Sequence, residues 1–192
     1  MIHRLAGVLL LVLVSACTSA TTPQVVAEVA GEPVTAAEFT ARMADHRTAV
    51  AAYFHEHHRA DPNQQAFWSD EIGGTTPRAM LRQRTLDALV EIKVQQIMAR
   101  EAGLIADIGY DTFLKRLDEE NADRRERLER HEPIFGPQQF TEKTYHAYCF
   151  DRMVLDLKKT LPASADYPAL VAERVRHVTI AIHEDALNPL LP

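Results

Sequence analysis

The hydrophobic and polar positions along the chain predict a mostly helical protein with one short strand near each end. In residues 24–30 and 174–183, apolar residues alternate with other types and many are β-branched, which predicts a strand in each segment. We expect these strands to pair and to join the chain ends as a small β element on a multi-helix domain. Apolar residues recur at helical spacing in four other segments: 35–59, 77–102, 110–117 and 141–161.

Turn and capping residues set the expected boundaries of these elements. Residues 31–33 (GEP) predict a turn after the first strand. Thr35 and Glu38 predict a capping box, in which the threonine hydroxyl accepts from the Glu38 amide while the glutamate bonds back. The sequence Asp61-Pro62 predicts that the first helix ends before it. The other start and stop signals are Pro77, Gly103, Thr141 and Pro162.

Two segments stand apart from the apolar pattern. Residues 118–131 are almost wholly polar, which is typical of a solvated helix with many ion pairs or of a projection beyond the core. Residues 60–77 form a long connection that contains Phe67 and Trp68. Two interpretations of this aromatic pair stay open: it fills the core under the connection, or it presents an exposed surface for binding.

The N-terminus predicts a lipoprotein signal peptide over residues 1–16. A basic start precedes an apolar run at 5–14, which is too short to span a bilayer permanently. Residues 13–17 (LVSAC) resemble the bacterial lipobox, in which the cysteine is acylated. The resemblance implies a lipid on Cys17, a tether over residues 17–24, and a place on the extracytoplasmic face of a bacterial envelope membrane. The alternative is an ordinary secretory signal with an incidental cysteine.

Composition limits the partners and the covalent chemistry. The net charge is −6 and the chain has no basic run, which argues against nucleic acid as a partner. The length after residue 16 suits one domain with a real core. Cys17 and Cys149 are the two cysteines, so acylation of Cys17 leaves Cys149 without a partner for an internal disulfide.

No motif in the sequence predicts a catalytic, metal or cofactor site. His55, His57 and His58 lie one to three residues apart, whereas helical metal ligands favour a spacing of four, so we expect a solvated helix end. Cys149 lies among aromatic residues, and we expect an inert buried thiol. A glycine-rich phosphate loop and a G-x-S-x-G elbow are both absent from the sequence, and no small-molecule substrate is evident.

Several motifs resemble one family of envelope proteins. Residues 25–35 (VVAEVAGEPVT), followed by a helix, resemble the opening of the SurA/PrsA-type N-terminal chaperone domain of the peptidyl-prolyl isomerase foldases. Residues 99–104 (AREAGL) resemble the helix end of that domain before a capping glycine. Residues 118–125 and 134–137 are similar to segments of its lipoprotein relatives. The resemblance covers roughly residues 25–161 and implies a SurA-N-like helical domain.

The chain departs from this family after Leu161. The isomerase foldases carry a parvulin domain there, whereas residues 162–192 are long enough only for a C-terminal extension with a short strand. Residues 174–178 (RVRHV) superficially resemble the start of a parvulin domain, but the rest of its catalytic pocket is missing. We therefore expect no isomerase activity and assign His177 no catalytic role.

The lipid signal and the resemblance together imply a membrane-anchored lipoprotein that binds unfolded exported polypeptides as a chaperone, without being an enzyme. Apolar burial in a groove between helices would supply the affinity, and Phe67 and Trp68 are the candidate client-binding residues. The first alternative is a structural or assembly lipoprotein that holds one specific folded partner. The second is an enzyme whose site is assembled from distant residues.

Overall fold

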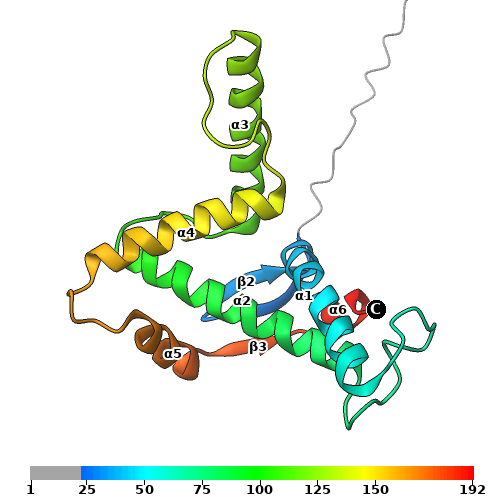
Figure 1. Ribbon diagram of the computed structural model, residues 1–192. Coiled ribbons are helices and arrows are strands. Elements are labelled where there is room, and N and C mark those ends of the chain that lie inside the picture. Colours follow the sequence, from blue (N-terminus) through cyan, green and yellow to red (C-terminus); the bar gives the residue numbers. More distant parts are fainter. Residues whose placement is uncertain (1–22) are drawn as a thin grey trace, which may run out of the picture.

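The computed structural model describes residues 23–192 and is mostly helical with one small sheet (Figure 1). The expected signal peptide and Cys17 lie outside the described residues. The mostly helical fold class, with a small β element built from both ends of the chain, is confirmed. Over residues 23–192, no helix is both long and apolar enough to cross a membrane. The helices are α1 (Ala36–His58), α2 (Pro77–Glu101), α3 (Tyr110–Glu129), α4 (Glu142–Thr160), α5 (Tyr167–His177) and α6 (Glu184–Leu187), followed by a short 3-10 turn.

The sheet has the order β2-β1-β3, and both pairs are antiparallel. The first strand, β1 (Val25–Val29), is joined to β2 (Glu32–Thr35) by a two-residue turn. Ala30 and Gly31 have φ values of 52° and 80°, as a type I′ hairpin turn requires. The predicted turn at residues 31–33 is therefore wrong, because Glu32 already pairs with Val29.

The C-terminal segment contains a helix that the sequence analysis assigned to a strand. Residues 174–177 belong to α5, and only Ile180–Ile182 form the strand β3. Asp166 starts α5, since its carboxylate accepts a hydrogen bond of 3.2 Å from the Ala169 amide. Val171 is buried on the face that α5 turns toward the core. Helix capping and burial thus outweigh the local alternation of residue types.

The start of α1 is capped as predicted, but the capping box is incomplete. The Glu38 amide donates to Thr35 Oγ1 over 3.2 Å. The Glu38 carboxylate does not return to the cap, because it points into the core and pairs with Lys93 at 3.1 Å. A complete box is found instead at the start of α4, between Thr141 and Thr144.

One hydrophobic core joins β1, α1 and α2 to the C-terminal segment. Val171 of α5 and Leu187 of α6 are 5% and 0% exposed within it, so the C-terminal extension (residues 162–192) contributes to the same core. Phe67 is also in this core, 2% exposed and edge-on to Phe54. Phe67 therefore fills the core under the connection and does not present an exposed binding surface.

Helix α3 and the connection that follows it (residues 130–140) project from the rest of the molecule as an arm (Figure 1). This α3 arm has both features expected of residues 118–131. It projects beyond the core, and α3 carries ion pairs between residues four apart. Arg124 holds the connection against the helix by donating to the carbonyls of Phe135 and Pro137. Asn121 anchors its end, accepting from the Phe140 amide at 2.8 Å and donating to the Phe140 carbonyl at 3.0 Å.

Replacing Asn121 by alanine is expected to lower the free energy of unfolding by about 1–3 kcal/mol, because both backbone groups of Phe140 then lack a partner in a buried place. Urea denaturation followed by circular dichroism measures this loss. Asn63→Ala is the matched control, since Asn63 is exposed and bonds only to Asp61. A loss for Asn121→Ala no larger than for Asn63→Ala would show that the Asn121 bridge does not stabilise the arm.

Candidate functional site

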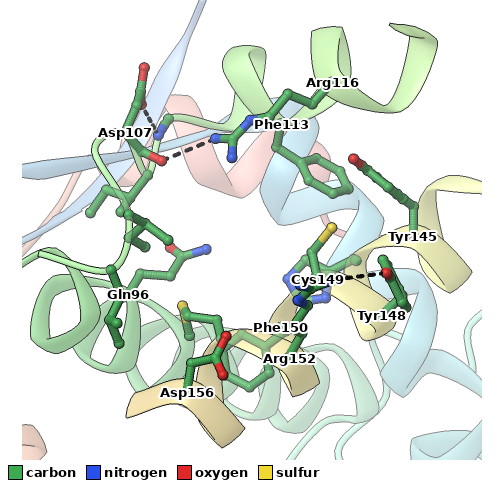
Figure 2. Close-up of a pocket in the computed structure, with 16 residues that line it drawn as sticks. Gln96, Asp107, Phe113, Arg116, Tyr145, Tyr148, Cys149, Phe150, Arg152 and Asp156 are labelled. Carbon is green, nitrogen blue, oxygen red and sulfur yellow. Dashed lines mark hydrogen bonds between the residues drawn. The ribbon is translucent and has the colours of Figure 1, made fainter. Parts of the chain in front are cut away.

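A cavity of about 280 Å³ lies between the end of α2, the start of α3 and the inner face of α4 (Figure 2). We call it the α2–α4 cavity. It is open on one side, and its volume is near the lower end of the range for ligand pockets. The labelled residues of Figure 2 that line it are Gln96, Asp107, Phe113, Arg116, Tyr145, Tyr148, Cys149, Phe150, Arg152 and Asp156.

Aromatic rings from α3 and α4 form one wall of the cavity. The ring of Phe113 stacks on that of Tyr145, with centroids 5.5 Å apart, and Tyr145 stacks on Tyr148 at 6.5 Å. Phe113 also lies 5.7 Å from Tyr110, the first residue of α3. These residues recur at intervals of three or four, so each helix presents its rings on one face. The wall is therefore preformed and apolar.

The loop between α2 and α3 forms the opposite rim and is held by Asp107. The Asp107 carboxylate accepts from the Gly109 amide and from Thr112 Oγ1 at 2.6 and 2.7 Å. These two donors stabilise the charged form and lower the pKa of Asp107. Arg116 Nη2 donates to the Asp107 carbonyl at 3.1 Å, which ties the loop to α3.

Polar and charged groups from different helices also line the cavity. Gln96 Oε1 is buried and accepts no hydrogen bond from residues 23–192. Arg152 Nη1 donates to the Tyr148 hydroxyl at 3.3 Å, and Asp156 lies one helical turn further along α4. A cavity with an aromatic wall and an unpartnered acceptor suits a ligand that combines an apolar group with an N–H donor.

Cys149 lies on the aromatic wall, beside Phe113 and Tyr145 (Figure 2). Its side chain is partly buried rather than fully enclosed. Burial raises the pKa of this thiol, so the neutral form predominates at neutral pH. The thiol thus contributes apolar surface and is poorly suited to act as a nucleophile.

His146 forms part of the cavity floor and is held between two rings. Its imidazole stacks on Phe150 at 5.6 Å and meets Phe113 edge-on at 5.8 Å. Arg42 Nη1 donates to His146 Nδ1 over 3.3 Å, which requires that nitrogen to be unprotonated. Burial first, and the neighbouring Arg42 second, lower the pKa of His146 to about 4.

Behind the cavity lies a buried network of charges that links α1, α2 and α4. Lys93 is 1% exposed, pairs with Glu38 and donates to the Ile108 carbonyl at 3.3 Å. Arg42 pairs with Glu142 of α4 at 2.9 Å. Burial raises the pKa of Glu38, whereas the nearby Lys93 and Arg42 oppose that rise. The network fixes the end of α2 and the loop that carries Ile108, and so positions the cavity.

The sequence analysis did not find this network, although a signal was present. Lys93 interrupts the apolar stripe of α2 between Leu89 and Val94, and Arg42 lies next to Met43 on the buried face of α1. A charged residue on an apolar face predicts a buried partner of opposite charge. The partner itself depends on tertiary contacts between helices.

Phe67 and Trp68, the client-binding candidates from the sequence, lie away from the cavity. Phe67 and Trp68 belong to the connection that precedes α2, whereas the cavity is at the other end of that helix. Phe67 is buried, and Trp68 is partly covered by the Arg47 guanidinium at 4.5 Å from its ring centroid. Phe67 therefore offers no exposed surface to a client in this conformation.

The histidines at the end of α1 face the solvent. The Nδ1 atoms of His55 and His57 lie within hydrogen-bond distance of the carbonyl oxygens of Ala60 and Tyr53, at 3.1 and 2.9 Å. Within the part of the chain that the structure describes, no group of three or more metal-ligating side chains gathers in one place.

Comparisons with protein-family models, with curated proteins and with solved structures found no match to this chain. The resemblance to SurA/PrsA-type domains therefore rests on the sequence motifs alone.

Proposed function

We propose that this protein is an extracytoplasmic, membrane-anchored lipoprotein that binds unfolded exported polypeptides without isomerase catalysis. The observation that supports this most is the α2–α4 cavity, which leaves aromatic surface open between helices. In this proposal the cavity accepts apolar side chains of the client. The unpartnered Gln96 Oε1 would accept from a client amide N–H.

The size of the cavity fits weak and unspecific binding. Burying one large apolar side chain contributes about 1.5–3 kcal/mol. A contact of this strength alone corresponds to a dissociation constant in the millimolar range or weaker. A client that offers many apolar side chains in turn would be held long enough to delay aggregation and would still be released to fold.

The proposed membrane anchor is the acylated Cys17, whose support is the lipobox-like sequence that precedes it. Two or three acyl chains, each methylene contributing about 0.8 kcal/mol, hold a domain on a membrane almost permanently. Mass spectrometry of the chain expressed in a bacterium with lipoprotein processing tests this anchor. A chain that begins at residue 17 with added acyl mass is expected, and an unmodified cysteine would contradict the anchor.

The Leu104→Glu variant is expected to weaken suppression of client aggregation about tenfold, which corresponds to about 1.4 kcal/mol of lost binding. Leu104 lines the cavity and is 38% exposed, so a charge there opposes apolar ligands without disturbing the core. Light scattering of a denatured client, titrated with the soluble 18–192 fragment, measures the effect.

Leu128→Glu is the matched control for this variant. Leu128 is 37% exposed but lies on the α3 arm, outside the cavity lining. We expect Leu128→Glu to suppress aggregation as the unaltered fragment does. Equal losses for the two variants, or no suppression by the unaltered fragment at molar excess, would contradict the proposed function.

The α3 arm favours a second candidate, a structural or assembly lipoprotein that holds one folded partner. The arm projects from the body, and Phe135 on it is 87% exposed (Figure 1). Affinity capture separates the two candidates. One stoichiometric partner lost on Phe135→Ser would support assembly, whereas many weakly bound unfolded chains would support the chaperone.

A further inference from the structure

Strand β3 forms an open edge of the sheet. The Ala30 amide donates to the Thr179 carbonyl, and the His183 amide donates to the Val26 carbonyl. In an antiparallel ladder alternate residues point their backbone groups to the same side, so the N–H and C=O groups of Ala181 also point toward β1. The N–H and C=O groups of Ile180 and Ile182 therefore point away from β1.

The two edges of the sheet differ in their protection against a further strand. Pro33 in β2 lies opposite Glu28, and the backbone groups of Glu28 face β3. The backbone of Pro33 therefore faces the outer edge of β2, where proline has no N–H group to donate. Strand β3 is short, but it consists of Ile180, Ala181 and Ile182 and so carries neither proline nor a charged side chain. The two isoleucines are 43% and 37% exposed. Natural proteins usually protect such edges with charges or proline, and an edge left open is a place where another chain can pair.

A second cavity adjoins this edge. It has a volume of about 470 Å³, and we call it the α2–α5 cavity. Its walls come from the facing sides of the two helices, and Ile180 of β3 also lines it. Val90 and Val171 are buried in its floor. A strand added beside β3 would thus lie next to a cavity able to take its apolar side chains.

The charges at this place indicate what kind of strand fits. Asp87 and Glu91 line the α2–α5 cavity one helical turn apart on exposed positions of α2. Asp87 accepts a hydrogen bond of 2.8 Å from Gln83. Within residues 23–192, neither carboxylate has an ion pair, and the cavity lining contains no lysine or arginine. Basic side chains on the incoming strand would complement both carboxylates.

We propose that β3 binds an extended, basic and apolar segment of another polypeptide as a fourth strand of the sheet. Backbone hydrogen bonds to Ile180 and Ile182 supply affinity that is independent of sequence, and the α2–α5 cavity selects apolar side chains. This surface is separate from the α2–α4 cavity. The inference rests on the proposed function only where it takes the natural segment to come from an unfolded client.

A peptide of sequence KTVTVTK, blocked at both ends, tests the proposal on the 18–192 fragment. Its lysines and valines share one face of the strand, so the same face can meet the cavity and the carboxylates. Hydrogen exchange followed by NMR is expected to slow at least tenfold at the amides of Ile180 and Ile182 when the peptide is saturating. The peptide KTPTVTK lacks one N–H donor toward β3 and is expected to bind at least tenfold more weakly. The peptide ETVTVTE is expected to lose affinity as well, because it places acids near Asp87 and Glu91.

Ile182→Lys is expected to weaken KTVTVTK binding at least tenfold, because the new charge repels the lysines of the peptide and removes apolar surface from the edge. Leu155→Lys is the matched control, since Leu155 is 59% exposed on α4 and lines neither cavity. Equal losses in both variants, unchanged exchange at Ile180 and Ile182, or equal binding of KTPTVTK would overturn the proposal. So would sedimentation that shows a dimer of the unaltered fragment and a monomer of the Ile182→Lys variant, because β3 would then pair two copies of this chain.

The two proposals fail separately in these experiments. Loss of client protection on Leu104→Glu with no effect of peptide on β3 exchange would leave the proposed function standing and remove the β3 inference. Slowed exchange at β3 with no client protection would do the reverse. The exchange measurement uses the unaltered sequence, so a variant that fails to fold does not affect it.

Discussion

Replacing Lys93 by methionine is expected to lower the free energy of unfolding by about 3–5 kcal/mol. Lys93 and Glu38 are 1% and 5% exposed and lie 3.1 Å apart. Methionine fills a similar volume but leaves the Glu38 carboxylate in the core without its cation. Glu38 Oε2 already has no hydrogen-bond partner among the described residues. Chemical denaturation of Lys93→Met against the unaltered chain measures the loss.

Two further variants show whether the loss comes from the orphaned charge. The double variant Glu38→Gln/Lys93→Met removes both charges, and we expect it to recover much of the stability, because an isolated buried charge costs more than a neutral pair. Arg100→Met is the matched control for an exposed pair. Arg100 and Glu32 lie 2.7 Å apart with side chains 37% and 24% exposed, and we expect a loss below about 1 kcal/mol. Similar losses for Lys93→Met and Arg100→Met would contradict the importance of burial.

The free energy of unfolding is expected to contain a contribution from His146 that falls by about 3 kcal/mol between pH 7 and pH 4. The pKa of His146 is lowered to about 4 in the folded chain, against 6.5 for the free side chain. Between these values the unfolded chain binds more protons than the folded chain. The stability is therefore fully present above pH 6.5 and is lost as the pH falls toward 4.

Comparison with His146→Phe isolates this contribution from that of the carboxylates. Phenylalanine keeps the stacking on Phe113 and Phe150 but cannot be protonated. We expect the difference in unfolding free energy between the two chains to change by about 3 kcal/mol over this pH range. His177→Phe, at an exposed position of α5, controls for the removal of one histidine. A constant difference between His146→Phe and the unaltered chain would mean that protonation of His146 does not oppose folding.

Local sequence signals account for most of the helices and for the sheet. Thr35, Thr141 and Pro77 lie at or next to helix starts because their preferences act through the adjacent backbone. The strand pairing of the chain ends follows from the apolar alternation of both segments. The end of helix α5 was missed because residues 174–177 run directly into the β-branched, alternating residues that follow them, and only the cap at Asp166 and the contact of Val171 with the core favour the helix.

The candidate site was less predictable than the fold. Cys149 and its aromatic neighbours were noted in the sequence, but the cavity forms only where α4 meets the end of α2 and the start of α3. Phe67 and Trp68 were the better candidates by composition, and the connection folds back to bury the first of them. Whether an aromatic side chain is covered depends on contacts distant in sequence, which a local pattern does not contain.

The central place of β1 in the sheet constrains the order in which the molecule can be completed. This strand precedes all the helices in the chain, yet its partner β3 and the core residue Leu187 follow α5 and are therefore made much later. Until then one edge of β1 stays unpaired and Val26 lacks part of its cover. Pairing between such distant segments is slow. The newborn chain therefore passes through a stage in which it is itself in need of protection from aggregation.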